Sequence, residues 1–311
     1  MTELVTLFGG GGFLGRYVAQ ALLRQGVRVR LAGRDPKRAF FVKTQAALGQ
    51  VQFAAVDVAK PETVARAVAG ADAVVNLVGV LAGDFEKLHV GGARIVAKAA
   101  AEAGVKALVH VSAIGADPRS PSAYGRSKGE GEAAVKAAFP AATIIRPSIV
   151  FGPEDDFVNR FAQLIQLLPI VPVIGPTTRF QPVYVADVAQ AIAAATFDSE
   201  TFGGQTYEIG GPEVITMADL NRRVAAMIGR TPTFLDLPDG LSGMIARLGF
   251  LPGAPITMDQ WTMLQRDNVV SEDAATIAAF GIQPAPIGSV APSWLVRYRK
   301  AGRFGTERKA S

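Results

Sequence analysis

Apolar positions in the first half of the chain form short runs that alternate with helix-like patterns. Residues 4–8 form one such run, four glycines follow, and Leu14, Val18 and Leu22 then recur at the spacing of one helix face. Residues 73–78 form another run with little polar interruption, as expected of a parallel strand that is buried on both faces. Strands that alternate with helices in this way predict an α/β fold of the Rossmann type, with a doubly wound parallel sheet.

The pattern changes after Pro153, where proline-rich and helical segments replace the regular alternation. Thr216 and Asp219 form a capping box that predicts a helix to about residue 228. We therefore expect three parts: a sheet domain of residues 1–152 to which 181–210 return, a smaller and mostly helical C-terminal lobe of residues 153–180 and 211–300, and a basic tail of residues 301–311.

The net charge of +5 changes this picture only at the C-terminus. Residues 297–311 contain six basic side chains and one acid, Glu307, so that the rest of the chain is formally neutral. A solvated, frayed terminus is one interpretation of this tail. Docking to an anionic membrane surface or to an acidic protein is the other, and nucleic acid is not expected because no basic and aromatic face accompanies the tail.

Composition excludes several classes of site and is compatible with a reducing compartment, and we expect a cytoplasmic protein. The chain has no cysteine, which excludes disulfides, thiolate metal sites and a cysteine nucleophile. No metal-ligand spacing links the two histidines, His89 and His110, so we expect no metal site. The first strand begins almost at Met1 and no apolar segment is long enough to span a bilayer, which predicts a soluble protein without a secretory leader.

The glycine-rich loop after the first predicted strand is the first candidate binding element. Gly9, Gly12 and Gly15 follow a G-x-x-G-x-x-G spacing that ends inside the next helix. Glycine allows a positive φ and a close approach to a ligand, and the N–H groups at a helix start favour an anion. A dinucleotide pyrophosphate would fit there, whereas a flexible glycine-rich turn is the alternative.

Residues after the second and third predicted strands indicate which dinucleotide is bound. Arg34 ends the second strand, with Lys37 and Arg38 close behind, and a guanidinium suits the 2′-phosphate of NADP. Asp35 argues for the 2′-hydroxyl of NAD instead. We favour NADP(H) over NAD(H), and we expect Asp57 to accept a hydrogen bond from the adenine amino group.

A tyrosine and a lysine one helical turn apart are the candidate catalytic pair. Tyr124 and Lys128 share one face of a predicted helix. An ammonium beside a phenol favours the phenolate, and the same lysine can donate to the nicotinamide ribose. Ser112, at the end of the fifth predicted strand, is the candidate hydroxyl partner.

These motifs together resemble the extended and atypical short-chain dehydrogenase/reductases. The agreement also includes residues 145–153, 182–189 and 207–212, and it runs in register from residue 4 to about 220. The resemblance implies a cofactor site made of Gly9, Gly11, Gly12, Phe13, Leu14, Gly15, Arg34, Lys37, Arg38, Asp57, Val58, Leu77, Val78, Gly79, Val111, Lys128, Pro147, Ser148 and Val150.

Within this superfamily the chain is most similar to the nucleotide-binding accessory subunits of respiratory complex I (NADH:ubiquinone oxidoreductase) and their bacterial relatives. Residues 12–18, 74–79, 138–140 and 180–185 carry this narrower similarity. It implies a tightly held NADPH, a structural or assembly role, complex I subunits as partners, and a peripheral place at the inner face of the respiratory membrane.

At two positions the sequence departs from the active enzymes, so it does not decide whether the protein catalyses a reaction. The catalytic Ser or Thr of the extended enzymes lies slightly beyond the strand end, where this chain has Ala113, Ile114 and Gly115, and His89 stands where an Asn often supports the Tyr–Lys pair. A cofactor-binding subunit would show such an incomplete set. An active NADPH-dependent oxidoreductase or epimerase on an apolar carbonyl substrate, and a binding module that senses the NADP(H) redox state, are the alternatives.

Overall fold

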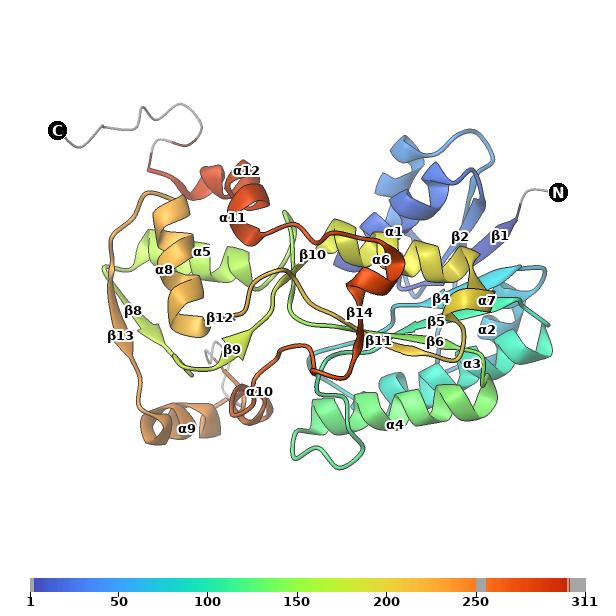
Figure 1. Ribbon diagram of the computed structural model, residues 1–311. Helices are drawn as coiled ribbons and strands as arrows, with labels where there is room; N and C mark the ends of the chain where they lie inside the picture. Colours follow the sequence, from blue (N-terminus) through green and yellow to red (C-terminus); the bar gives the residue numbers. More distant parts are fainter. Residues whose placement is uncertain (1–2, 250–255, 301, 303–311) are drawn as a thin grey trace. The chain divides into compact units, whose positions relative to one another are not determined.

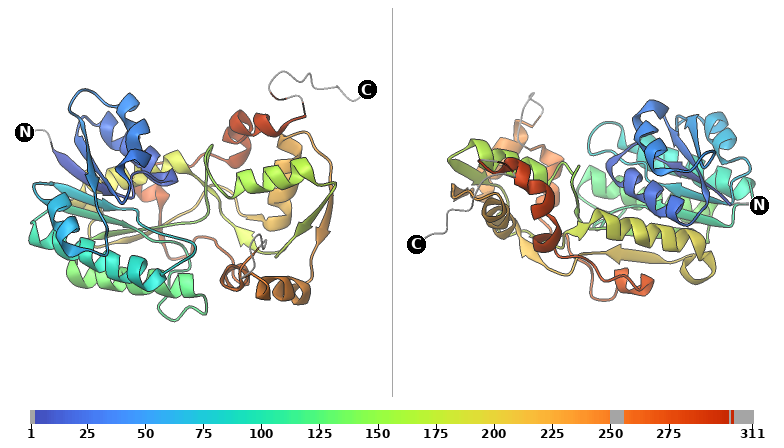
Figure 2. Two further views of the ribbon diagram at one scale, coloured as in Figure 1. Left: turned by 180° about the vertical axis from the view of Figure 1, so that it is seen from behind. Right: turned by 90° about the horizontal axis from the view of Figure 1, so that it is seen from above.

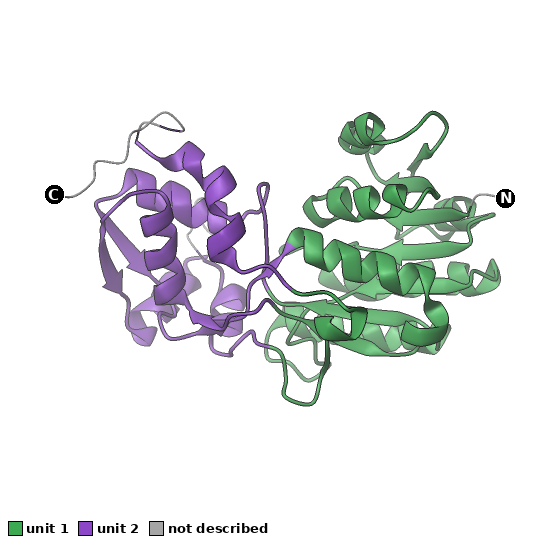
Figure 3. Ribbon diagram, turned by 45° about the horizontal axis from the view of Figure 1, so that its top comes forward, with its two compact units in different colours: residues 1–148, 185–210, 270–283 green, residues 149–184, 211–269, 284–311 purple. Residues whose placement is uncertain are grey.

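The computed structural model describes residues 3–249, 256–300 and 302 (Figure 1). The chain divides into two compact units, shown in different colours in Figure 3: unit 1 comprises residues 1–148, 185–210 and 270–283, and unit 2 comprises residues 149–184, 211–269 and 284–311. Of the expected basic tail 301–311, only Gly302 lies within the described residues.

Unit 1 contains an eight-stranded sheet in the order β14-β11-β6-β5-β4-β1-β2-β3, and the paired strands in it are parallel. The strands are β1 (Leu4–Phe8), β2 (Arg28–Gly33), β3 (Val51–Ala55), β4 (Ala73–Asn76), β5 (Ala107–Val111), β6 (Thr143–Pro147), β11 (Thr206–Ile209) and β14 (Ala275–Thr276). The strand order reverses at β1, which lies between β2 and β4. The predicted fold class is confirmed, and such a reversal is where open α/β sheets bind ligands.

Helices cover both faces of this sheet (Figures 1 and 2). They are α1 (Phe13–Arg24), η1 (Pro36–Gln45), α2 (Pro61–Val68), η2 (Glu86–Gly92), α3 (Ala93–Glu102), α4 (Ala123–Ala138), α6 (Val185–Phe197), α7 (Ser199–Phe202) and η3 (Ile277–Phe280). Helix α1 packs beside α6, whereas α2, α3 and α4 pack side by side. Helix α1 buries Val18, Leu22 and Leu23, so the helical spacing in the sequence marks the face that meets the sheet.

Unit 2 combines short helices with three pairs of short strands around its own core. Its helices are α5 (Val158–Leu167), α8 (Met217–Met227), α9 (Asp239–Arg247), α10 (Met258–Leu264), α11 (Ile287–Val290), α12 (Pro292–Leu295) and η4 (Val296–Tyr298). Three strand pairs accompany them: β7 (Val150–Phe151) with β10 (Val183–Tyr184), β9 (Arg179–Phe180) with β12 (Ile215–Thr216), and β8 (Ile170–Val173) with β13 (Thr233–Asp236). Phe151, Leu220 and Trp294 lie in the core of this unit. Within the described residues, no helix combines the length and apolarity that crossing a membrane requires.

Candidate cofactor-binding site

The loop between β1 and α1 is closed so tightly that only glycine fits at its end. A Cβ added at Gly15 would lie 2.5 Å from the Gly9 carbonyl oxygen and 2.7 Å from the Gly10 Cα. Gly9 has a φ of +81°, and the Gly12 N–H donates to the Gly9 oxygen over 3.0 Å. Gly15 therefore lets α1 pack directly against the turn, which is the role of the last glycine in a dinucleotide loop.

Within the described part of the chain, no side chain caps the first-turn N–H groups of helix α1 where it leaves this loop. Its N-cap, Gly12, has no side chain to accept from the first turn, and that turn contains no acidic residue. Gly11 and Gly12 are exposed, and Phe13 and Leu14, which begin the helix, are half-buried. These features fit an anionic pyrophosphate, because free N–H groups and the helix dipole both favour negative charge.

Cations border the loop at the end of β2. Arg34, Lys37 and Arg38 are exposed, and a Cβ added at Gly11 would lie 3.3 Å from the Arg38 Cβ, so Arg38 lies against the loop. The Asp35 carboxylate accepts from the Lys37 N–H over 3.0 Å and caps η1. The Asp35 carboxylate, which would favour NAD if it bound the ribose, is thus used to cap η1.

Arg16 is a further cation beside the loop, outside the set of site residues predicted from the sequence. It lies in the first turn of α1, and its guanidinium carbon is 4.1 Å from the centre of the Phe41 ring. This cation–π contact holds the side chain toward η1, the element that follows Arg34. Its position directly after Gly15 was the signal available in the sequence.

The end of β3 supplies the residues expected near adenine. The Asp57 carboxylate is half-buried and accepts from the Ala59 N–H over 3.0 Å. Val58 is buried, and a Cβ added at Gly92 would lie 2.9 Å from its Cγ2. Helix η2, which ends at Gly92, therefore packs closely against this loop.

The end of β4 runs toward Lys128. Asn76 accepts from the Val78 N–H over 3.1 Å and lies 3.1 Å from His110 Nδ1. Leu77 and Val78 are half-buried, Gly79 is exposed, and a Cβ added at Gly79 would lie 3.4 Å from Lys128 Nζ. The structure thus brings the predicted segment 77–79 and Lys128 together, while His110 is buried in the strand as a packing residue.

Lys128 is buried at the end of β5. Its Nζ donates to the Val111 carbonyl oxygen over 3.0 Å, so this predicted cofactor residue contacts Lys128 through its backbone. Burial lowers the pKa of Lys128 to about 8, and the charge of Glu132 opposes this shift. A lysine with this pKa is mostly protonated at neutral pH, so the end of β5 carries a buried positive charge.

Tyr124 stands one turn earlier on α4, whose N-cap Ser122 accepts from the Gly125 N–H over 3.2 Å. Burial raises the pKa of Tyr124 to about 12. This shift runs against the expected effect of the nearby ammonium, which would favour the phenolate. Tyr124 is a neutral phenol, which can donate a proton but is a poor base.

His89 connects α4 to the end of β4. Its Nε2 accepts from the Val80 N–H over 3.0 Å, and its Nδ1 lies 2.9 Å from Ser127 Oγ. A backbone N–H only donates, so Nδ1 carries the proton and donates to Ser127, which donates in turn to the Tyr124 carbonyl over 2.8 Å. Burial and the charge of Lys128 lower the pKa of His89 to about 4, so the imidazole remains neutral.

The histidine sits on a rare backbone conformation. Residues Glu86–Gly92 form a π-helix that continues into α3, and such segments are frequent at functional sites. A Cβ added at Gly131 of α4 would collide with the His89 carbonyl oxygen. The His89 ring stacks on Phe85 and meets the Tyr124 ring edge-on. The π geometry of this segment leaves no periodic signal in the sequence.

The remaining predicted residues follow β5 and β6. Ser112 is 4% exposed, and among the described residues its Oγ has no hydrogen-bond partner, an orphan that a bound group could satisfy. Pro147 accepts from the Ile114 N–H over 3.1 Å, and Ser148 is buried. Val150 lies in β7, which belongs to unit 2.

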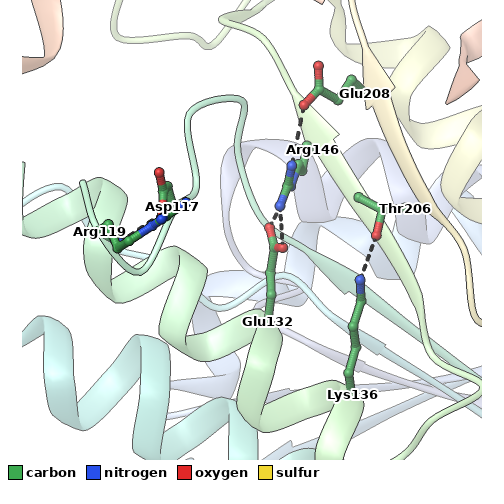
Figure 4. A network of polar contacts seen from close by, with 7 residues as sticks. All are labelled: Asp117, Arg119, Glu132, Lys136, Arg146, Thr206 and Glu208. Atoms are coloured by element: carbon green, nitrogen blue, oxygen red, sulfur yellow. Dashed lines mark hydrogen bonds and ion pairs between the residues drawn. The ribbon is translucent and has the colours of Figure 1, made fainter. Parts of the chain in front are cut away.

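A partly buried ion network supports α4 beneath this site (Figure 4). Arg146 of β6 forms a bidentate pair with Glu132, with distances of 2.8 and 2.7 Å, and its Nη1 lies 3.4 Å from Glu208 of β11. Glu208 also accepts from the Ser271 N–H over 2.9 Å. Glu132 follows Lys128 by one turn, so the network holds the Lys128 face of α4 against the sheet.

Comparisons with known proteins agree with this geometry. The model of the NAD dependent epimerase/dehydratase family matches residues 5–210. The "NADH dehydrogenase [ubiquinone] 1 alpha subcomplex subunit 9, mitochondrial" of Arabidopsis thaliana is 35% identical over 97% of this chain and 80% of its own, and the Mus musculus protein of the same name is 36% identical over 95% and 80%.

Two further matches concern reductases. A protein named ceramide reductase from Caulobacter vibrioides is 31% identical over 76% of this chain and 74% of its own. The crystal structure of an NADPH-dependent quinone oxidoreductase from Escherichia coli, in complex with NADPH, superposes with a TM-score of 0.77 over 94% of this chain and 99% of the other, at 18% identity. The latter is a likeness of fold alone.

Proposed function

The chain belongs to the NAD dependent epimerase/dehydratase family, whose members bind NAD(P), and we propose that it is an NADP(H)-binding accessory subunit of respiratory complex I. The observation that carries the proposal is the similarity to the subunit 9 proteins, which extends over 95% or more of this chain and so includes unit 2. In this role the cofactor stabilises the protein and is not consumed. The protein would lie at the inner face of the respiratory membrane as a peripheral subunit.

The described residues support a stable hold on NADP(H). The Gly9–Gly15 loop and the start of α1 would bind the pyrophosphate, and Arg34, Lys37 and Arg38 would bind the 2′-phosphate, with Arg16 nearby. Asp57 and Val58 would border the adenine. Gly79 leaves room beside Lys128, whose buried ammonium would donate to the nicotinamide ribose, and the orphan Ser112 hydroxyl would gain a partner.

Membranes of the native organism provide the test. They are solubilised mildly and separated on a native gel, and the tagged chain is located relative to the band with NADH dehydrogenase activity. We expect co-migration, and we expect NADPH to be released when the excised band is denatured. A chain that migrates alone while intact complex I is abundant contradicts the proposal.

A second candidate is an NADPH-dependent reductase that acts on a lipid carbonyl. It is favoured by the neutral Tyr124 phenol beside buried Lys128 and by the ceramide reductase relative. Bound NADPH supplies a hydride to an electron-poor carbon. Tyr124 would donate the proton that the resulting oxyanion requires, and Lys128 would stabilise the phenolate left behind.

Turnover separates the two candidates. NADPH oxidation is measured with long-chain ketones and keto-ceramides for the native chain and for Tyr124→Phe. Oxidation that depends on substrate and is lost in Tyr124→Phe would establish the reductase, while no oxidation above the rate without substrate supports the accessory role.

A further inference from the structure

Two hydrogen bonds hold the backbone of residues 78–80, which we call the β4 segment, where the chain leaves the sheet. The Val78 N–H donates to Asn76 Oδ1 over 3.1 Å, and the Val80 N–H donates to His89 Nε2 over 3.0 Å. Asn76 belongs to β4 itself, whereas His89 lies on the π-helix η2. The β4 segment is therefore fixed to the sheet at one end and to a separate helix at the other.

The middle of the β4 segment lies beside Lys128. Gly79 is exposed, and a Cβ added to it would lie 3.4 Å from Lys128 Nζ and 3.8 Å from His89 Nε2. Strand β4 is the neighbour of β1, where the strand order reverses, and open α/β sheets bind ligands beyond the strand ends at such a point. The β4 segment is therefore placed to contact a ligand that is bound beside Lys128.

His89 joins the β4 segment to α4 through both of its ring nitrogens. Nε2 accepts from Val80, and Nδ1 lies 2.9 Å from the Oγ of Ser127, which directly precedes Lys128 in α4. A neutral imidazole has one donor and one acceptor, so the ring can satisfy both partners only with its proton on Nδ1. His89 thereby fixes the separation between the β4 segment and the helix that carries Lys128.

The surrounding fold holds this imidazole in one place. Helix η2 approaches α4 closely only because α4 has a glycine at position 131, where an added Cβ would collide with the His89 carbonyl oxygen. The His89 ring stacks on Phe85 at a centroid distance of 5.3 Å and meets Tyr124 edge-on at 5.5 Å. Because His89 is only 2% exposed, a hydrogen bond that is lost here leaves a buried donor without a partner.

We propose that His89 is a positioning residue that sets how long NADP(H) stays bound. It holds the β4 segment beside Lys128, so that release of the cofactor requires the hydrogen bond between Val80 and His89 to break. The inference rests on the proposed function, because it takes NADP(H) as the ligand beside Lys128. It concerns retention of the cofactor and is the same whether or not the cofactor reacts.

The rate of NADPH release tests the proposal on the full chain. The chain is loaded with NADPH, an excess of NADP⁺ is added, and the loss of bound NADPH fluorescence is followed by stopped flow. We expect His89→Leu, which removes the acceptor for the Val80 N–H, to release NADPH about tenfold faster. His89→Gln should restore slow release, because its amide provides both an acceptor and a donor. Lys87→Gln, at an exposed position of the same π-helix, is the control and should release NADPH at the native rate.

The Val80 amide gives a second measurement, which does not depend on the cofactor. Hydrogen exchange by NMR on the cofactor-free chain should show this amide about tenfold less protected in His89→Leu than in the native chain or in His89→Gln. A general loss of stability would instead raise exchange throughout η2 and α4. Long-range ¹H–¹⁵N spectra should show His89 protonated at Nδ1. Ser127→Ala removes the acceptor of that proton and should also weaken the protection of Val80, although Ser127 bonds to the other ring nitrogen.

The outcomes separate this inference from the proposed function. A native chain that binds no NADPH contradicts the proposed function and the inference with it. Native retention of NADPH combined with an unchanged release rate in folded His89→Leu, as checked by circular dichroism, overturns the inference alone. Protonation of His89 at Nε2, or release from His89→Gln as fast as from His89→Leu, also overturns it. If His89→Leu does not fold, Ser127→Ala decides, and native protection of Val80 in that variant overturns the inference.

Discussion

The two ends of the candidate cofactor site are built in different ways. At the glycine-loop end, backbone donors and exposed cations border a turn in which even a methyl group would collide at Gly15. At the α4 end, the functional groups are titratable side chains: Lys128 and His89 are buried, Tyr124 is half-buried, and hydrogen bonds and an ion network hold this end in place. The first construction holds an anion. The second fixes where the protons of the tyrosine, lysine and histidine lie. A subunit that only holds its cofactor needs the α4 end to support the bound cofactor and does not need it for proton transfer.

The largest effect is expected at the glycine-loop end. Gly15→Ala places a Cβ against backbone atoms that cannot move independently, and overpacking of this kind costs about 3 kcal/mol of unfolding free energy. We expect NADPH affinity, measured by calorimetry, to be lost as well. Gly288→Ala, where an added Cβ meets nothing within 4 Å, is the control and should leave stability and affinity unchanged. Full NADPH affinity in Gly15→Ala would show that the tight turn is not part of the site.

The next largest loss of stability is expected when the ion network that supports the α4 end is broken. Glu132→Ala leaves Arg146 without its bidentate partner beneath Lys128, and breaking a largely buried pair costs about 3 kcal/mol. Urea denaturation should show this loss, whereas Lys136→Ala, which removes an exposed bond to Thr206, should cost under about 0.5 kcal/mol. Similar losses for both variants would mean that the network does not stabilise α4.

The difference in affinity between NADPH and NADH tests the role of the cations at the glycine-loop end. Arg34→Ala should weaken NADPH binding by about 2 kcal/mol and leave NADH nearly unchanged, because only the former has a 2′-phosphate to pair with a guanidinium. The same measurement on Lys60→Ala, an exposed lysine outside the cation cluster, controls for a general loss of positive charge. Equal losses for the two cofactors would remove Arg34 from the 2′-phosphate site.

The pH dependence of stability tests the α4 end. The chain has two histidines, and burial lowers the pKa of His89 to about 4 and of His110 to about 3. Below pH 6.5 the unfolded chain binds protons that the folded chain does not, so unfolding free energy falls as pH falls toward 4. Each histidine contributes on the order of 1 kcal/mol per pH unit in that window.

Thermal melts at pH 6 and pH 5 measure this contribution. His89→Asn should reduce the dependence on pH by about half, because one of the two buried neutral imidazoles is gone. An unchanged dependence in His89→Asn would mean that His89 titrates normally and is not held as the neutral donor to Ser127.

The smallest effect is expected from the catalytic candidate itself. Tyr124→Phe removes a hydroxyl without changing the ring that meets His89 and Phe85. We expect NADPH affinity within about 0.5 kcal/mol of the native value. A large loss of affinity would mean that the phenol helps to hold the cofactor, and it would weaken the distinction between the two ends.

The sequence predicts the glycine-loop end better than the α4 end. Gly9, Gly12 and Gly15 can be interpreted from spacing because the backbone geometry of such a loop depends on glycine itself. The His89 connection cannot be anticipated, since it joins residues 80, 89 and 127 through a π-helix that leaves no periodic pattern. Nor does the sequence show that Tyr124 is a desolvated phenol, because burial depends on the packing of Phe85 and His89 around it.

The return of residues 270–283 to unit 1 also lay beyond sequence reasoning. Strand β14 is only two residues long, too short for alternation to be recognised. Its pairing with β11 is supported by Glu208, which accepts from the Ser271 N–H.

We infer that this protein holds NADP(H) for a respiratory complex and that this role requires no reaction of the cofactor. Complementation of a deletion strain tests it most directly, with the amount of assembled complex I on native gels as the measurement. We expect Tyr124→Phe to restore the native amount of complex and Gly15→Ala not to restore it. A Tyr124→Phe protein that binds NADPH normally, yet fails to restore the complex, would contradict it.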